Sequence, residues 1–262
     1  MRIALPTWPQ SWSRQQRSSA TIALASVTLL LLLWLMATPL ALAPDPIGNN
    51  AQAFADGSRV TVELTFIAGI TGIFIGVLAA LGRTSRVVPL RWIASLYIWV
   101  MRGTPLLVQI LFVCFALPTL VPWLRFDEFT SACVALAFNV GAYNAEAIRA
   151  GLLAVPKGQI EASRSLGMSS WYTFLDITFP QAFKVALPPL VNNTVALLKD
   201  SSLAYAIGVV ELTNVGNRIQ AATFQPLPTL ITTALVYLTL TTVMTQISDA
   251  VERRYDVEGR QP

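Results

Sequence analysis

Long hydrophobic runs without charge dominate the sequence, and they predict helices that cross a membrane. Five such runs occupy residues 18–44, 64–82, 103–124, 129–145 and 219–248. A helix needs about 20 apolar residues to span the hydrocarbon core of a bilayer. A further stretch, 184–210, is equally hydrophobic but contains Lys199 and Asp200. The pattern predicts an all-α integral membrane protein with about six transmembrane helices, near residues 19–43, 59–82, 92–118, 130–152, 184–209 and 227–250.

The first hydrophobic run has a second interpretation, as a cleaved signal peptide. Its end, Ala41, Leu42 and Ala43, resembles a signal-peptidase site. The run is longer than the hydrophobic segment of an ordinary signal peptide, and Pro44 would disturb the extended backbone that the protease binds. We therefore expect this helix to be retained.

The composition supports the membrane class and excludes several others. Only 12% of the 262 residues are charged and the mean hydropathy is +0.58, whereas soluble domains carry about 25% charged residues. The net charge of +4 comes without a concentrated basic run, which argues against nucleic-acid binding. Two isolated cysteines and no histidine leave no metal site and no catalytic triad. No phosphate-binding loop of the Walker type occurs, so we expect no catalytic residue and no cofactor on this chain.

The distribution of positive charge predicts the orientation. Cytoplasmic loops of membrane proteins carry an excess of lysine and arginine. If the N-terminus is cytoplasmic, three basic residues lie in outside loops, namely Arg59, Arg125 and Arg218. Thirteen then lie inside, namely Arg2, Arg14, Arg17, Arg83, Arg86, Arg91, Arg149, Lys157, Arg164, Lys184, Arg253, Arg254 and Arg260. We predict that both termini face the cytoplasm and that 153–183 is the longest cytoplasmic loop.

This loop is unusual because it contains the signals for two short helices. Residues 160–166 predict the first helix, and Gly167 is a natural stop that takes a positive φ. Ser169 or Ser170 can cap a second helix, which we expect Pro180 to end. The second helix would run through four apolar side chains, and the knob would present such side chains toward a partner; they are Trp171, Phe174, Leu175 and Ile177. The alternative is an amphipathic loop that lies on the membrane surface.

The same loop resembles the coupling loop of the permease subunits of bacterial ABC importers. In that family the pattern is E-A-A, three residues, G, nine residues, then I-x-L-P. This chain has the matching set Glu161, Ala162, Ser163, Gly167, Ile177 and Pro180. Serine replaces the second alanine, and Phe179 replaces the leucine. The resemblance implies that the loop docks into the ATPase subunit, so the candidate coupling residues are Glu161, Ala162, Gly167, Trp171, Phe174, Ile177 and Pro180.

Further segments are similar to the polar amino acid permeases of the histidine and glutamine type. They read MRGTPLLVQ at 101–109, PQAFKVALPPLVNN at 180–193, LLKDSSL at 197–203 and GVVELT at 208–213. The resemblance implies a permease core at 59–255 that contains the coupling loop 153–183, with residues 1–58 as an added helix and its flanks. It also implies the partners: two ATPase subunits that bind ATP and Mg²⁺, a second permease that is identical or homologous, and a periplasmic or membrane-anchored amino-acid-binding protein.

Polar residues inside the predicted spans are the candidates for contact with substrate. An ionisable residue costs at least roughly 2.5–3.5 kcal/mol at the centre of a membrane, so Lys199 and Asp200 must face a cavity or pair with other helices. Their charges match those of an amino acid zwitterion; the alternative is an interhelical lock. We favour Asn139 and Ser201 as pathway residues alongside them, and we interpret the pair at 192–193 as packing asparagines.

Two other features leave alternatives open. The sequence from Arg102 to Pro105 breaks the third span, and it can line a vestibule or form a plain kink. Gly72 and Gly76 have the G-x-x-x-G spacing of close helix packing within or between subunits. A secondary transporter or channel driven by ion gradients is the main rival function, but the inverted repeats of such proteins are absent from the sequence. A membrane enzyme is a weaker rival, because few ionisable groups lie within the spans.

Overall fold

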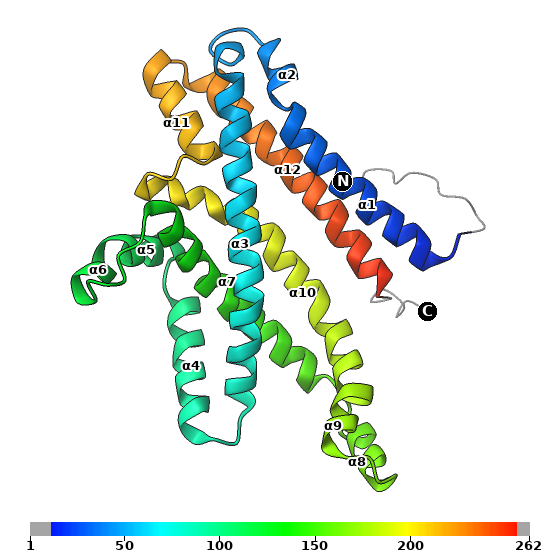
Figure 1. Cartoon of the computed structure of the whole chain (residues 1–262). Helices are drawn as coiled ribbons and strands as arrows, with labels where there is room; N and C mark the ends of the chain where they lie inside the picture. The colour runs from blue at the N-terminus through cyan, green and yellow to red at the C-terminus, as the bar shows by residue number, and fades with distance from the viewer. Residues whose placement is uncertain (1–11, 256–262) are drawn as a thin grey trace.

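The computed structural model describes residues 12–255, and every regular element in that range is helical (Figure 1). Arg2 and Arg260, which we predicted to be cytoplasmic, lie outside the described residues. The longer helices are α1 (Arg14–Leu35), α3 (Ala51–Thr84), α4 (Val88–Gly103), α7 (Glu128–Leu153), α10 (Phe179–Asp200), α11 (Leu212–Thr223) and α12 (Pro226–Arg254). The shorter ones are α2 (Ala37–Ala41), α5 (Leu106–Leu111), α6 (Leu117–Leu120), α8 (Lys157–Ser165), α9 (Ser170–Tyr172), η1 (Gly48–Asn50), η2 (Phe112–Ala116), η3 (Thr173–Thr178) and η4 (Ser201–Ile207).

Helix α3 is the central column of the molecule, and α7 crosses it at close range (Figure 1). Small residues permit this approach, since a Cβ placed on Gly76 would lie 2.7 Å from the Cβ of Asn144 and 3.1 Å from the carbonyl oxygen of Gly141. A Cβ placed on Gly72 would likewise come too close to the Val140 side chain and to the carbonyl oxygen of Ala137. The G-x-x-x-G spacing therefore serves packing within the chain.

Helices α1 and α12 form an antiparallel pair along one side of the bundle (Figure 1). Their contact belongs to the largest apolar cluster, which joins Leu29 of α1, Phe54 of α3 and Leu240 of α12. The outward side of α1 stays apolar and exposed, as Leu30 and Trp34 show with exposed fractions of 66% and 72%. This is the pattern of a helix that faces lipid on one side.

The third predicted span, 92–118, is not one straight helix. The axes of α4 and the α5–α6 segment differ by 112°, with Thr104 and Pro105 at the break. Pro105 lacks the N–H that would continue the helix, and it forces the preceding residue into extended backbone, with Thr104 at φ −116° and ψ 148°. The π-helical segment η2 interrupts the second half again.

The predicted number of six spans is not confirmed. Within the described residues, three helices are long and apolar enough to cross a membrane, and the bent pair makes a fourth if it counts as one span. These three are 15–41, 48–84 and 226–254. Helices α7 and α10, with 26 and 22 residues, are long enough but are not among the helices that combine this length with a sufficiently apolar stretch. Polar side chains from both helices, including Asn139 and Asn193, line the interior site described below.

Candidate functional site

A protruding knob formed by α8, α9 and η3 occupies one end of the molecule (Figure 1). Helix α8 ends in a Schellman motif, in which the N–H of Gly167 donates to the carbonyl of Arg164 at 3.0 Å. The N–H of Met168 donates to the carbonyl of Ser163 at 3.1 Å. This geometry requires the left-handed backbone of Gly167, whose φ is +81°. The predicted helix stop and its positive φ are both present.

The second arm of the knob begins where the sequence indicated. The hydroxyl of Ser169 accepts from the N–H of Tyr172 at 3.4 Å, and the Ser163 hydroxyl hydrogen-bonds Thr173 at 3.1 Å across the two arms. The prediction that Pro180 ends this helix is wrong. Pro180 lies in the first turn of α10, and the chain stays helical from α9 through η3 into α10. The i→i−5 bonding of η3 shifts the carbonyls that the proline ring would otherwise meet.

The candidate coupling side chains divide into exposed and packed groups. Trp171 is 65% exposed, and Glu161 and Ala162 are also exposed on α8. Phe174 and Ile177 are half-buried, and the Phe174 ring stacks on Trp171 with centroids 6.5 Å apart. The knob therefore presents the Glu161 carboxylate and the Trp171 indole to the outside, among other exposed side chains, on a small packed base.

A second feature is a cavity of about 350 Å³ among α5, α7, α10 and η4. Its lining includes Thr104, Pro105, Asn139, Tyr143, Asn193 and Asp200. The cavity brings the helix break together with two of the polar candidates, although these segments are far apart in the sequence. Asn193, which we interpreted as a packing residue, lines the cavity and also donates to Asn144 Oδ1 at 2.9 Å.

Asn139 of α7 is held in place by hydrogen bonds to the bent helix pair, α4 and the α5–α6 segment. Its Nδ2 donates to Gln109 Oε1 at 3.0 Å and to the Met101 carbonyl at 3.3 Å. Gln109 in turn donates to the Thr104 hydroxyl at 2.8 Å. The break leaves backbone carbonyls without partners inside the helix, and these amide bonds satisfy them. The same network therefore fixes the bend and one wall of the cavity.

The adjacent residues Lys199 and Asp200 face different spaces. Asp200 lines the cavity with Asn139, whereas Lys199 lines a pocket of about 270 Å³ beside Thr213 and Tyr237. Ser201 is fully buried and donates to the Leu198 carbonyl at 2.8 Å. Neighbouring residues on a helix point about 100° apart, which accounts for this separation. Arg102 is exposed and does not line the cavity, but its guanidinium carbon lies 5.3 Å from the ring centroid of the lining residue Tyr143.

Glu211 is a buried carboxylate that the sequence reasoning did not single out. It is 0% exposed and caps α11 by accepting from the N–H groups of Thr213 and Asn214, each at 2.8 Å. The Tyr237 hydroxyl of α12 also donates to it at 2.8 Å. An acidic residue directly before a helix is the signal that could have found it. The carboxylate ties α11 to α12.

We expect Glu211→Ala to lower the stability of the purified protein. The substitution removes a helix cap and the hydrogen bond that the part-buried Tyr237 hydroxyl donates to the carboxylate, so the unfolding midpoint should fall by about 4 °C or more. Thermal unfolding in detergent, followed by size-exclusion chromatography, measures the midpoint. Glu211→Gln keeps one acceptor oxygen and should lose less. An unchanged midpoint in the alanine variant would contradict the capping role.

Comparisons with known proteins agree with this arrangement. Residues 72–257 match the family described as binding-protein-dependent transport system inner membrane component. The chain is 41% identical over 201 residues to the L-cystine transport system permease protein TcyB of Bacillus subtilis, covering 76% of this chain and 85% of that protein. It is 39% identical over 202 residues to the glutamine transport system permease protein GlnP of Escherichia coli, covering 77% and 92%.

Solved structures give the same result. A crystal structure of an amino acid ABC transporter with histidines has a chain 38% identical to this one, with a TM-score of 0.73 over 79% of this chain and 95% of that chain. The methionine ABC transporter MetNI in an inward-facing conformation shares the fold, with a TM-score of 0.67 at 19% identity. With the family match over most of its length, the chain belongs to the binding-protein-dependent inner membrane components, the permeases of ABC transporters.

Proposed function

We propose that this chain is the permease subunit of an ATP-driven importer of amino acids, coupled to separate ATPase subunits through the loop 153–183. The observation that carries the proposal is the knob at the end of a membrane bundle, with Trp171 and Glu161 exposed on it. An exposed indole that lies outside the membrane-spanning helices is typical of a contact site for a protein partner. ATP and Mg²⁺ belong to that partner.

The cavity is the proposed site where substrate passes. Asp200 offers a carboxylate to the ammonium group of an amino acid. Arg102, which lies over the ring of the lining residue Tyr143, carries the opposite charge and suits the substrate carboxylate. Asn139 and Asn193 supply amides for the remaining polar atoms. Among its relatives, TcyB is named for L-cystine and GlnP for glutamine, which supports a polar amino acid as cargo.

The proposed assembly contains two permease chains, two ATPase subunits and an amino-acid-binding protein outside the membrane. Purification of the tagged chain in mild detergent should retain an ATPase at one copy per permease. Reconstituted vesicles should then take up labelled amino acid only with ATP, and competition by unlabelled amino acids identifies the cargo. Uptake driven by an ion gradient in the absence of ATPase would instead favour a secondary transporter.

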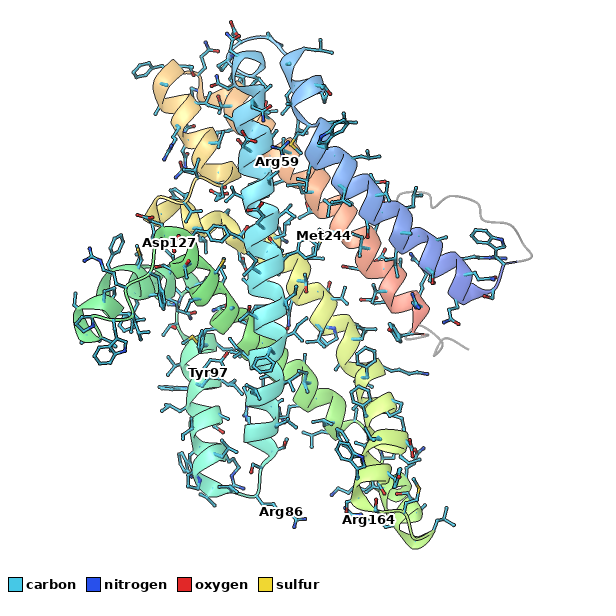
Figure 2. All side chains as sticks on the ribbon, viewed as in Figure 1. Arg59, Arg86, Tyr97, Asp127, Arg164 and Met244 are labelled. Carbon is cyan, nitrogen blue, oxygen red and sulfur yellow. The ribbon has the colours of Figure 1, made fainter. Side chains whose placement is uncertain are left out.

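We predict that both termini of the chain are cytoplasmic, on the same side as the knob. Arg86 in the turn after α3 and Arg164 on α8 lie at one end of the molecule, and Arg59 lies toward the other (Figure 2). This separation supports the excess of basic residues on one side of the membrane. Reporter fusions at Arg14 and Arg260 should both give a cytoplasmic signal. A periplasmic signal at Arg260 would overturn the orientation.

A further inference from the structure

Helices α1, α3, α10 and α12 surround an apolar cavity of about 490 Å³ that is separate from the cavity at Asp200. Its walls include Leu29 and Leu30 of α1, Phe66 of α3, Val191 of α10, and Met244 and Val251 of α12. The label of Met244 in Figure 2 marks the part of α12 that lines this cavity. The volume falls within the range of roughly 300–1,000 Å³ that is typical of ligand sites.

The cavity opens sideways, toward the surroundings of the bundle. Leu30 and Phe66 line it and are still 66% and 44% exposed, so its mouth lies on the outer apolar face. In a membrane-spanning permease this face meets the hydrocarbon chains of lipids. Nine of the cavity's lining residues are apolar, and three carry hydroxyls, namely Ser26, Thr194 and Ser248. The hydroxyl of Thr194 is already used, since it donates to the Leu190 carbonyl at 3.1 Å. The interior therefore suits an alkyl chain.

Two cations continue the walls of the cavity beyond one end. On α12 the lining residues Met244, Ile247 and Val251 follow one face of the helix, and Arg254 is the next residue on that face. On α10, Lys184 precedes the lining residue Val191 by two turns on the same face.

The two helices approach each other at this end of the cavity. The rings of Phe183 and Tyr255, which neighbour Lys184 and Arg254 in the sequence, lie with centroids 5.2 Å apart. Both Lys184 and Arg254 are exposed, and neither makes a salt bridge with another described residue. The cations are thus available to a negative group at the same end.

We propose that this site binds one anionic phospholipid, with an acyl chain in the cavity and the phosphate between Lys184 and Arg254. An apolar chamber with cations at one end matches the two parts of such a lipid. A second copy of this chain is a poorer match, because the chain has a net charge of +4 and brings no surplus of negative charge. The proposal is independent of which substrate the permease carries.

Native mass spectrometry of the full-length chain, purified with its partners and exchanged into equimolar phosphatidylglycerol and phosphatidylcholine of identical acyl chains, tests the site. We expect one phosphatidylglycerol to be retained per chain. Lys184→Gln with Arg254→Gln should weaken its retention roughly tenfold to thirtyfold. The matched control removes two exposed cations elsewhere, by Arg86→Gln with Arg91→Gln, and should retain the lipid.

Val191→Trp fills the chamber and should displace the lipid without touching the cations. Glycerol phosphate, which has the headgroup charge but no acyl chain, should not compete. Equal retention of both lipids, or equal losses in the two double variants, would overturn the proposal. So would a Val191→Trp variant that keeps the lipid but loses a dimer of this chain, because the cavity would then hold a second copy.

Discussion

Gly167→Val is expected to lower ATP-driven uptake by roughly tenfold or more while the amount of the chain in the membrane stays normal. An L-residue in the left-handed region costs roughly 1–2 kcal/mol, and a β-branched residue is the worst case. Relief of this strain would undo the Schellman motif and re-aim α9 with Trp171. A Cβ on Gly167 would meet no atom within 4 Å, so the packing of the bundle should not suffer.

The knob itself supplies the control. Gly158 of α8 also has open space around its Cβ position, but its φ is not positive. Gly158→Val therefore adds the same side chain without the backbone penalty and should transport at close to the normal rate. Gly167→Asn should retain more uptake than Gly167→Val, because asparagine tolerates a positive φ. Copurification of the ATPase is measured for each variant. Normal uptake by Gly167→Val in an assembled complex would show that the knob is not the coupling element.

Asp200→Asn is expected to lower uptake by roughly tenfold to a hundredfold without loss of the assembled complex. Asp200 lines the cavity, and its carboxylate makes no salt bridge with another described residue. A hydrogen bond to a charged group contributes roughly 1.5–3 kcal/mol, and this is the interaction that an ammonium group of the substrate would lose. Uptake in vesicles and the yield of the complex are measured together.

Asp56→Asn is the control, because it makes the same chemical change at an exposed ion pair. In that pair Asp56 Oδ1 lies 2.7 Å from Arg59 Nη1. Such pairs contribute little, so uptake should be nearly normal. Lys199→Gln tests the neighbouring charge, which faces the pocket of Thr213 and Tyr237. If Asp200→Asn reduces the yield of the complex while the remaining complex transports normally, the carboxylate is an interhelical lock.

Local chemistry explains what the sequence could predict. Hydrophobic runs located the helices at 14–41, 128–153 and 226–254 to within a few residues, because the cost of exposing polar groups to lipid is set residue by residue. The two short helices of the knob could also be predicted from the sequence, since a serine cap and a glycine stop act within one turn. Pro180 was misjudged because the π-helical segment η3 lets the chain continue past a proline.

The arrangement of polar groups across helices needed the tertiary structure. The break at Pro105 was visible in the sequence, but its 112° bend depends on Gln109 and Asn139, which lie on different helices. The separation of Lys199 from Asp200 and the burial of Glu211 depend on how each helix is rotated about its axis. Hydropathy fixes which segments enter the membrane. Rotation and packing, which involve contacts between residues far apart in the chain, decide which side chains share a cavity.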